Sequence, residues 1–153
     1  MNAAVRDYWE KFLELSPEVQ RDTAFQVWYF GNTRDMAKEL ANLVVAGKKS
    51  ATASLVAVNE LRPEDAPVLD GYSVVTDLDD TPRCVIQTTE IRHMPFGEVD
   101  AQFAFDEGEG DQSLEYWRKV HYKYFTREAV KLGLDFNSFS MVCCERFTLS
   151  YPR

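Results

Sequence analysis

Apolar side chains recur at helical spacing in several stretches of the chain, and this pattern predicts the main helices. The stretches are residues 4–15, 33–46 and 113–132. Asn32 or Thr33 can cap the second helix at its N-terminus, and Gly47 stands where a glycine commonly follows a helix. A further helix is expected to begin at Ser16, because the proline that follows is tolerated in a first helical turn.

Between these helices the pattern changes to short apolar or alternating runs, which predict β-strands. The runs are residues 25–31, 50–58, 70–77, 83–93 and 138–149. Loops rich in proline, glycine and aspartate separate them, and a short helix or turn is expected before the acidic loop at 106–111. No repeat or low-complexity linker divides the chain, so we expect all these elements to form one compact unit.

Composition and charge narrow the function classes. A chain of 153 residues suits a single domain with a substantial core. Its net charge of −8 argues against broad binding to nucleic-acid phosphates but leaves room for a local basic groove. The odd cysteine count, without CxxC spacing, argues against a disulfide framework or a zinc site. No membrane-length apolar run or signal-peptide core is present, so we expect a cytoplasmic protein.

Candidate chemistry concentrates where the helix ending near residue 46 meets the next strand. Lys48 and Lys49 lie at this junction, and the hydroxyls of Ser50, Thr52 and Ser54 would share one face of the strand. Lysines near a helix C-terminus complement its dipole, but this does not account for the hydroxyls. A lysine whose pKa is lowered by burial could instead act as a base beside a threonine nucleophile.

The acidic loop at 106–111 also admits two interpretations. It is either a flexible turn with a helix cap, or a source of a general acid or of oxygen ligands for a hard cation. Its spacing fits no calcium-loop template, and we expect no metal site.

The predicted helix at 113–132 separates an apolar stripe, which includes His121, from a basic stripe. The basic stripe consists of Lys119, Lys123, Arg127 and Lys131. Such a stripe is typical of a solvated face, yet it is the best candidate track for an RNA backbone in this acidic chain. His121 is expected to be a hydrogen-bonded histidine at the edge of the core.

One carboxylate interrupts an apolar strand face. Glu145 alternates with apolar residues in the run 138–149, so it must be paired or have a raised pKa. We expect a cationic partner, namely Arg83, Arg92 or Lys49; the alternative is a carboxylate at the floor of a site.

Several segments together resemble the ASCH domain family of the PUA-like superfamily, in its longer bacterial branch. The matching segments are 28–31, 37–41, 47–52, 82–86, 94–99, 103–111, 113–121 and 142–147. The resemblance implies an α+β fold, with a small mixed β-barrel of about five or six strands and flanking helices. Residues 1–24 are then an N-terminal helical extension packed on the barrel, and residues 25–153 form the ASCH domain.

The resemblance also implies a function directed at RNA, a nucleotide or a modified nucleoside. It points to a hydrolase of the ribonuclease or nucleoside-amidohydrolase type, with a non-catalytic RNA-binding or nucleotide-sensing module as the alternative. The implied catalytic residues are Lys49, Thr52 and Glu109, with Glu107 competing for the place of the acid. No cofactor is expected, apart from a divalent metal in the ribonuclease case, and no oligomeric state is implied.

Further residues are expected to contact the ligand. The set consists of Trp28, Ser54, Glu107, Arg118 and His121. Ser54 stands where the family commonly has an arginine, so a bidentate anion clamp is missing here. Arg118 is the expected spatial substitute for that arginine.

Overall fold

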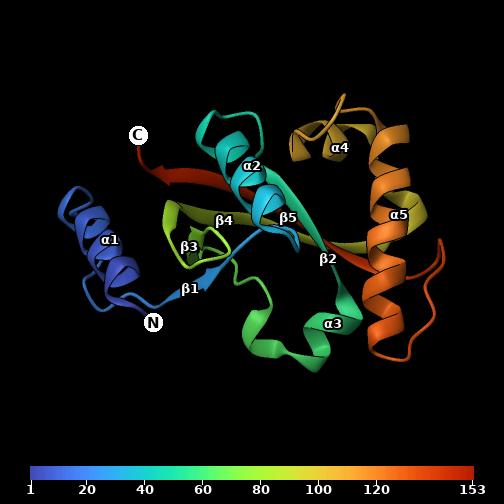
Figure 1. The fold of residues 1–153 in the computed structure, drawn as a ribbon, viewed down its shortest axis with the longest axis horizontal. Helices are drawn as coiled ribbons and strands as arrows, with labels where there is room; N and C mark the ends of the chain where they lie inside the picture. The colour runs from blue at the N-terminus through green and yellow to red at the C-terminus, as the bar shows by residue number, and fades with distance from the viewer.

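The computed structural model describes residues 1–153, and its centre is a five-stranded mixed sheet flanked by helices (Figure 1). The strands are β1 (Phe25–Trp28), β2 (Ala51–Leu55), β3 (Tyr72–Thr76), β4 (Pro82–Pro95) and β5 (Met141–Tyr151). Their order across the sheet is β1-β3-β4-β5-β2; β1 pairs with β3 in parallel, and all other pairs are antiparallel. The expected α+β class is therefore confirmed.

The sheet is not closed into the expected barrel. Strands β1 and β2 are its two edges and do not pair with each other. Both are short, with four and five residues. The run at 50–58, expected to be one strand, leaves the sheet after Leu55, which pairs with Val142 near the beginning of β5. Because β2 has no further partner there, the chain turns into a short helix instead.

Five helices and two short 3-10 turns complete the fold. They are α1 (Ala3–Glu14), α2 (Arg34–Val45), α3 (Val56–Leu61), α4 (Ala101–Glu107), α5 (Leu114–Lys131), η1 (Pro63–Asp65) and η2 (Phe96–Glu98). The Thr33 hydroxyl accepts from the N–H of Met36 and caps α2, as its sequence position predicts. The helix expected at Ser16 is absent: residues 16–24 form isolated turns whose hydrogen bonds join residues three apart.

Three apolar clusters hold the helices against the sheet. Helix α1 packs on β3 and β4 at one end, where Trp9 stacks on Phe25. Helices α4 and α5 pack on β2 and β5 at the other end, around Trp117 and Phe125. Helix α2 lies between these two groups in Figure 1 and contributes Val44 to the third cluster. This packing places α5 beside the free edge of β2, where the candidate site lies.

Two findings bear on the expectations from composition. No helix combines the length and hydropathy needed to cross a membrane. All three cysteines are buried free thiols, as the absence of CxxC spacing predicts. The division into an extension at 1–24 and a domain at 25–153 stays a prediction.

Candidate functional site

A cleft lies where the two edges of the sheet approach α5. It consists of two adjoining cavities of about 170 and 190 Å³, which share Gly31, Thr52, Ala53 and Tyr124. The first, which we call the edge pocket, is lined by residues of both edge strands, among them Trp28 and Ser54. The second, the helix pocket, lies against α5. The cleft therefore lies between β1 and β2, the two edge strands that do not pair with each other.

Lys49 lies beneath this cleft and is almost completely buried, with 2% of its surface exposed, whereas its neighbour Lys48 is exposed. Its ammonium donates to Oε1 of Glu107 and to Oε2 of Glu109, each at 2.8 Å, and to the main-chain oxygen of Ala51 at 2.9 Å. The Lys49 Nζ also lies 5.2 Å from the centre of the Phe30 ring. Every donor of this ammonium therefore has a partner inside the protein.

The loop between α4 and α5 brings its carboxylates to Lys49 because it contains a glycine at the point of contact. Gly108 has a φ of +74°, and a side chain there would collide with the main chain of Lys48 and Lys49. The two glutamates on either side of Gly108 can then reach the same ammonium. The alternation of glutamate and glycine in the loop is therefore a structural requirement of the pair.

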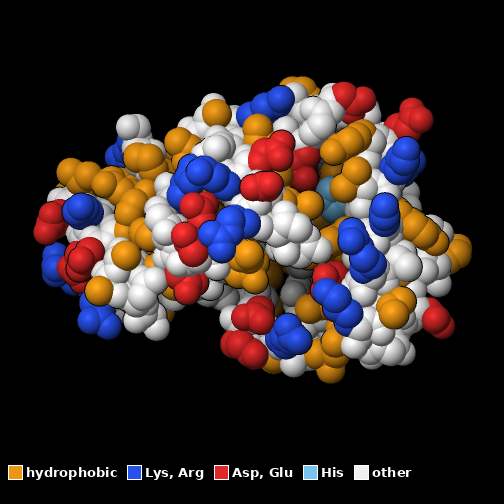
Figure 2. All heavy atoms as spheres, viewed as in Figure 1, with side chains coloured by type: hydrophobic (Ala, Val, Ile, Leu, Met, Phe, Trp, Pro, Cys, Tyr) orange, Lys and Arg blue, Asp and Glu red, His pale blue; other side chains and the backbone are white.

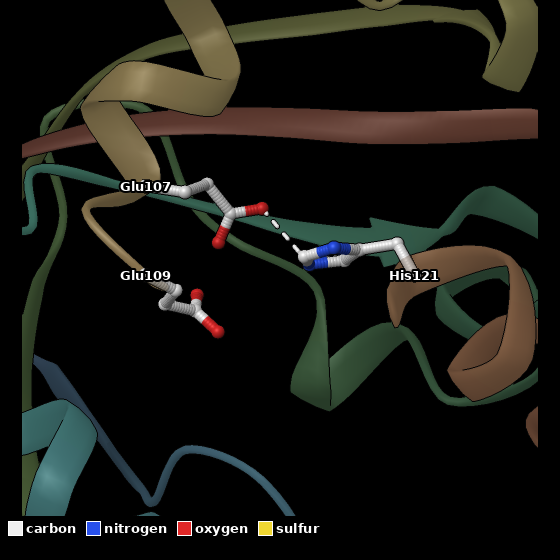
Figure 3. Close-up of side chains that lie close together, drawn as sticks. All are labelled: Glu107, Glu109 and His121. Carbon is white, nitrogen blue, oxygen red and sulfur yellow. Dashed lines mark ion pairs between the residues drawn. The ribbon is translucent and has the colours of Figure 1, made fainter. Parts of the chain in front are cut away.

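Glu107 connects this ammonium to α5. Its Oε2 accepts from the Trp117 indole N–H at 2.6 Å and from Nε2 of His121 at 3.1 Å. Nδ1 of His121 lies 2.9 Å from the main-chain oxygen of Trp117, and the two rings stack at 4.3 Å. Figure 3 shows Glu107 at the end of α4, Glu109 in the loop that follows, and His121 pointing toward them from the opposite side. With an acceptor at each ring nitrogen, the imidazolium form of His121 is favoured.

The pKa shifts follow from this arrangement. Burial alone would lower the pKa of Lys49, but the charges of Glu107 and Glu109 raise it above its ordinary value. Burial also opposes the charge of Glu107, yet Lys49 and His121 hold the pKa of that carboxyl well below its usual range. Burial raises the pKa of Glu109, the charge of Lys49 opposes this rise, and the nearby Glu107 adds to it. Glu107 is thus a fixed anion, whereas Glu109 is the carboxyl suited to proton exchange.

The same residues are the only candidates for a metal. Atoms of Glu107, Glu109 and His121 that could bind a metal lie within 4.8 Å of one another. However, the Lys49 ammonium already bridges the two carboxylates, and the second oxygen of Glu107 holds Trp117 and His121. A divalent ion would have to displace these partners. The arrangement therefore fits an internal ion-pair network better than a metal centre.

The edge pocket contains a second polar group. Thr52 on β2 pairs in register with Glu145 on β5, and both line this pocket. Glu145 is 7% exposed, and its Oε2 accepts from the Thr88 hydroxyl at 2.6 Å. Burial raises the pKa of Glu145.

The expected cationic partner of Glu145 is not there. Arg83 binds Asp77, and Arg92 binds Glu90. Lys49 forms no ion pair with Glu145 and acts on it only through its field. The expectation of an ion pair is therefore wrong, because β4 supplies a neutral hydroxyl donor at this position.

The other predicted ligand residues divide into two groups. Trp28 and Ser54 line the edge pocket, although the Ser54 hydroxyl is already bound by the Asn59 side chain. Arg118 lies outside the cleft, where its guanidinium donates to the main-chain oxygens of Gly97 and Val99. It lines neither pocket, so it does not take the place of the missing arginine.

The cleft also contains Tyr124, which the sequence did not assign to a site, and two residues of the predicted basic stripe. Tyr124, Lys123 and Arg127 project from α5 and line the helix pocket. Figure 2 shows basic side chains in a row along α5, beside the hollow. The spacing of four residues between Lys123 and Arg127 marks them as neighbours on one helix face, but the sequence does not show that this face borders a cleft.

Two features define this class of small α+β domain. One is an open mixed sheet with α5 beside its free edge. The other is a pair of glutamates, separated by a glycine, that bind one buried lysine. The family model of the ASCH domain matches residues 26–151. The chain belongs to the ASCH domain family, and the resemblance seen in the sequence is confirmed.

Solved structures agree with this assignment. An ASCH domain from Lactobacillus crispatus JV V101 has a TM-score of 0.90 at 30% identity, covering 99% of this chain and 97% of that one. The protein EF3133 from Enterococcus faecalis V583 has a TM-score of 0.85 at 30% identity, covering 99% of this chain and 92% of that one. The hypothetical protein PH0355, with a TM-score of 0.52 at 17% identity over 82% of this chain and 97% of its own, shares only the fold. Among curated proteins no significant relative is found.

Proposed function

We propose that this protein is a hydrolase that removes a small acyl group from a nucleobase, in a modified nucleoside or in RNA. The observation that carries the proposal is the position of Thr52. Thr52 lines both pockets of the cleft, and it shares the helix pocket with Glu107 and Glu109, the two partners of Lys49. A hydroxyl that faces a cleft beside a buried cation and an exchangeable carboxyl is suited to nucleophilic attack on a carbonyl carbon.

Each residue of the network has a distinct part in this mechanism. Lys49 carries a permanent positive charge, so it cannot be the base that the sequence leaves open; it positions Glu109 and offers a favourable field for negative charge in the cleft. Glu109 protonates the leaving nitrogen, because its pKa is raised and 18% of its side chain is exposed. Glu107 holds Lys49, Trp117 and His121 in place.

The walls of the cleft suit a nucleotide. Trp28 and Tyr29 line the edge pocket and offer aromatic surfaces on which a base can stack. Lys123 and Arg127 line the helix pocket and take part in no ion pair within the protein. They are suited to a phosphate, which agrees with the general link of the ASCH family to RNA binding.

A second function is favoured by one specific observation. The Lys49 ammonium has no donor left for a ligand, as expected if the network only stiffens a binding site. The cleft would then hold a nucleotide or a short RNA without reacting with it.

One experiment separates the two functions. Acetylated cytidine, other acylated nucleosides and short single-stranded RNAs would be tested for turnover and for an increase in melting temperature. For the hydrolase, Thr52→Val abolishes turnover but keeps binding, whereas Ser50→Ala, two residues earlier on the exposed side of the junction, keeps both. If the wild type binds one of these compounds but turns over none of them, the hydrolase is refuted and the non-catalytic binding function is supported.

A further inference from the structure

Glu145 is a buried carboxylate that has no part in the mechanism proposed for Thr52, Lys49 and Glu109. We propose that Glu145 is the general base that takes the proton from the Thr52 hydroxyl. This inference rests on the proposed nucleophilic role of Thr52. It assigns a catalytic role to a residue of β5 that is paired with Thr52 and forms no hydrogen bond with the network of Lys49 and Glu107.

A threonine hydroxyl needs a base to become a useful nucleophile, and the network beneath the cleft does not supply one. Lys49 is a protonated ammonium whose donors are all bound. His121 has an acceptor at each ring nitrogen, so it has no free lone pair to offer. Glu109 is held by Lys49 through Oε2 and is assigned to the leaving group.

The geometry of the sheet places Glu145 next to Thr52. The two residues are directly paired in the antiparallel ladder of β2 and β5. Side chains in such pairs share a face, with their β-carbons about 4.5–5.5 Å apart. Both side chains line the edge pocket, so a substrate that reaches Thr52 also meets the carboxylate.

The carboxylate is oriented and has one oxygen to spare. Thr88 donates to Oε2 at 2.6 Å, and no protein group donates to Oε1. Thr88 is itself buried and so holds the carboxylate in one orientation. A nucleophile, a base and a third group that orients the base are the recurring parts of an activated nucleophile.

The charged and titratable groups around Glu145 are few. Burial raises the pKa of Glu145, and the Thr88 hydrogen bond and the charge of Lys49, the only cation acting on it, lower the pKa by less. Cys143 lies two residues earlier on β5, and its own pKa is raised by burial to about 11, so it stays neutral. Tyr29, Asp65 and Tyr124 line the same pocket, from the segment after β1, from η1 and from α5. The result is a carboxylate more basic than a surface glutamate.

In the proposed reaction, an acyl–nitrogen bond is hydrolysed through an ester of Thr52. Glu145 takes the Thr52 proton as the threonine oxygen bonds to the acyl carbon and the carbonyl electron pair moves to its oxygen. When that pair returns, the carbon–nitrogen bond breaks and Glu109 protonates the departing amine. Water next attacks the threonine ester and gives a proton to Glu109. As the acid leaves, Glu145 returns its proton to the Thr52 oxygen.

The first test uses an activated acetyl ester, p-nitrophenyl acetate, so that it does not depend on the natural substrate. Acetylation of Thr52 would be followed by mass spectrometry of the peptide that contains it. Glu145→Gln is expected to slow acetylation about 10²–10⁴-fold, the usual contribution of a general base. Glu90→Gln, which changes a carboxylate of the adjacent strand β4 that lines neither pocket, is expected to keep the wild-type rate.

The pH dependence separates a base from a merely structural residue. In the wild type the acetylation rate rises with pH through the raised pKa of Glu145, and Glu145→Gln loses this limb. Thr88→Val keeps the carboxylate but removes its orienting bond, so it lowers the rate while keeping the limb. Should Glu145→Gln fail to fold, the Thr88→Val rate decides the matter. A wild-type rate in either folded variant, or a wild type that never acetylates at Thr52, overturns the proposal.

Turnover of acetylated cytidine distinguishes this proposal from the proposed function. Turnover that requires Thr52 but not Glu145 refutes the base and keeps the hydrolase. Acetylation of Thr52 that depends on Glu145, with no turnover of any acylated nucleoside or RNA, refutes the hydrolase and keeps the base.

Discussion

The buried carboxylates of the two pockets differ in how many of their oxygens have a hydrogen-bond partner. In the helix pocket both oxygens of Glu107 are bound, by Lys49 on one side and by Trp117 and His121 on the other. In the edge pocket Glu145 has a single partner, the hydroxyl of Thr88. Both carboxylates are more than nine-tenths buried, so burial alone does not explain the difference.

The difference indicates which of the two carboxylates is structural and which is available to a substrate. A buried charge with all its partners is stable and inert, and removing one partner leaves the others uncompensated. A buried carboxylate with a free oxygen has a raised pKa and can exchange a proton with a neighbour. We therefore expect substitutions of Lys49 and Glu107 to affect mainly stability, and substitutions of Thr52, Glu109 and Glu145 to affect mainly activity.

The largest effect is expected from Lys49. Replacing it by methionine leaves Glu107 buried without its ammonium, which should lower the free energy of unfolding by about 3–5 kcal/mol. Chemical denaturation followed by circular dichroism measures this. The matched control is Lys48→Met at the exposed neighbouring position, where a change within about 0.5 kcal/mol is expected. Equal effects at the two positions would contradict the network.

The two glutamates of the loop should separate stability from activity. Glu107→Gln removes the carboxylate between three donors and should cost about 2–3 kcal/mol of unfolding free energy. Glu109→Gln loses a partly exposed pair and should cost about 1 kcal/mol or less. Its turnover, by contrast, should fall about 10²-fold or more if Glu109 is the acid. If Glu109→Gln kept a normal rate and a folded Glu107→Gln were inactive, Glu107 would be the acid and Glu109 would not.

The network also predicts how stability depends on pH. The pKa of His121 is raised above its ordinary 6.5, so its contribution is complete below pH 6.5 and is lost as pH rises through the folded value. The pKa of Glu107 is lowered from 4.5, so its contribution is complete above pH 4.5 and is lost as pH falls. The network should therefore be strongest between about pH 4.5 and 6.5.

Thermal melts between pH 5 and 8 would test the histidine half of this prediction. His121→Gln should flatten the decline in stability above pH 6.5, because it removes the group that loses its proton there. His93, the other histidine of the chain, is exposed on β4, and His93→Gln should keep the wild-type curve. An unchanged curve for His121→Gln would place the origin of the decline elsewhere.

Much of the fold could be predicted from the sequence because its helices are strongly periodic and capped. The Thr33 cap and the glycine after α2 are local signals, and the structure agrees with both. The barrel could not be judged in this way, since closure depends on whether β1 and β2 meet across the sheet. The end of β2 at Leu55 likewise depends on where β5 begins, about ninety residues later in the sequence.

The candidate site shows the same limit. The junction of lysines and hydroxyls suggests Lys49 and Thr52, but only the contacts show that Lys49 is a fully bound cation and therefore no base. The alternation along β5 marks Glu145 as anomalous, yet its actual partner is Thr88, a residue with no charge pattern to reveal it. Lys123 and Arg127 are visible in the sequence as a basic stripe, and the packing of α5 decides that this stripe borders the cleft.

The smallest effect is expected at this basic border, and it tests whether the helix pocket also has a role in binding. If Lys123 and Arg127 each contact one phosphate of a short single-stranded RNA, replacing both by alanine should weaken binding several-fold at moderate salt. The slope of log affinity against log salt should then fall by about 1.4, since each phosphate contact on a single strand contributes about 0.7. Fluorescence anisotropy at several salt concentrations measures both quantities.

Lys131, which pairs with Glu128 at the end of α5, is the matched control, and its replacement should leave the slope unchanged. A loss of slope of about 0.7 on replacing Lys131 alone would mean that the whole helix attracts RNA without regard to the cleft. The nucleotide would then need no specific place beside Thr52.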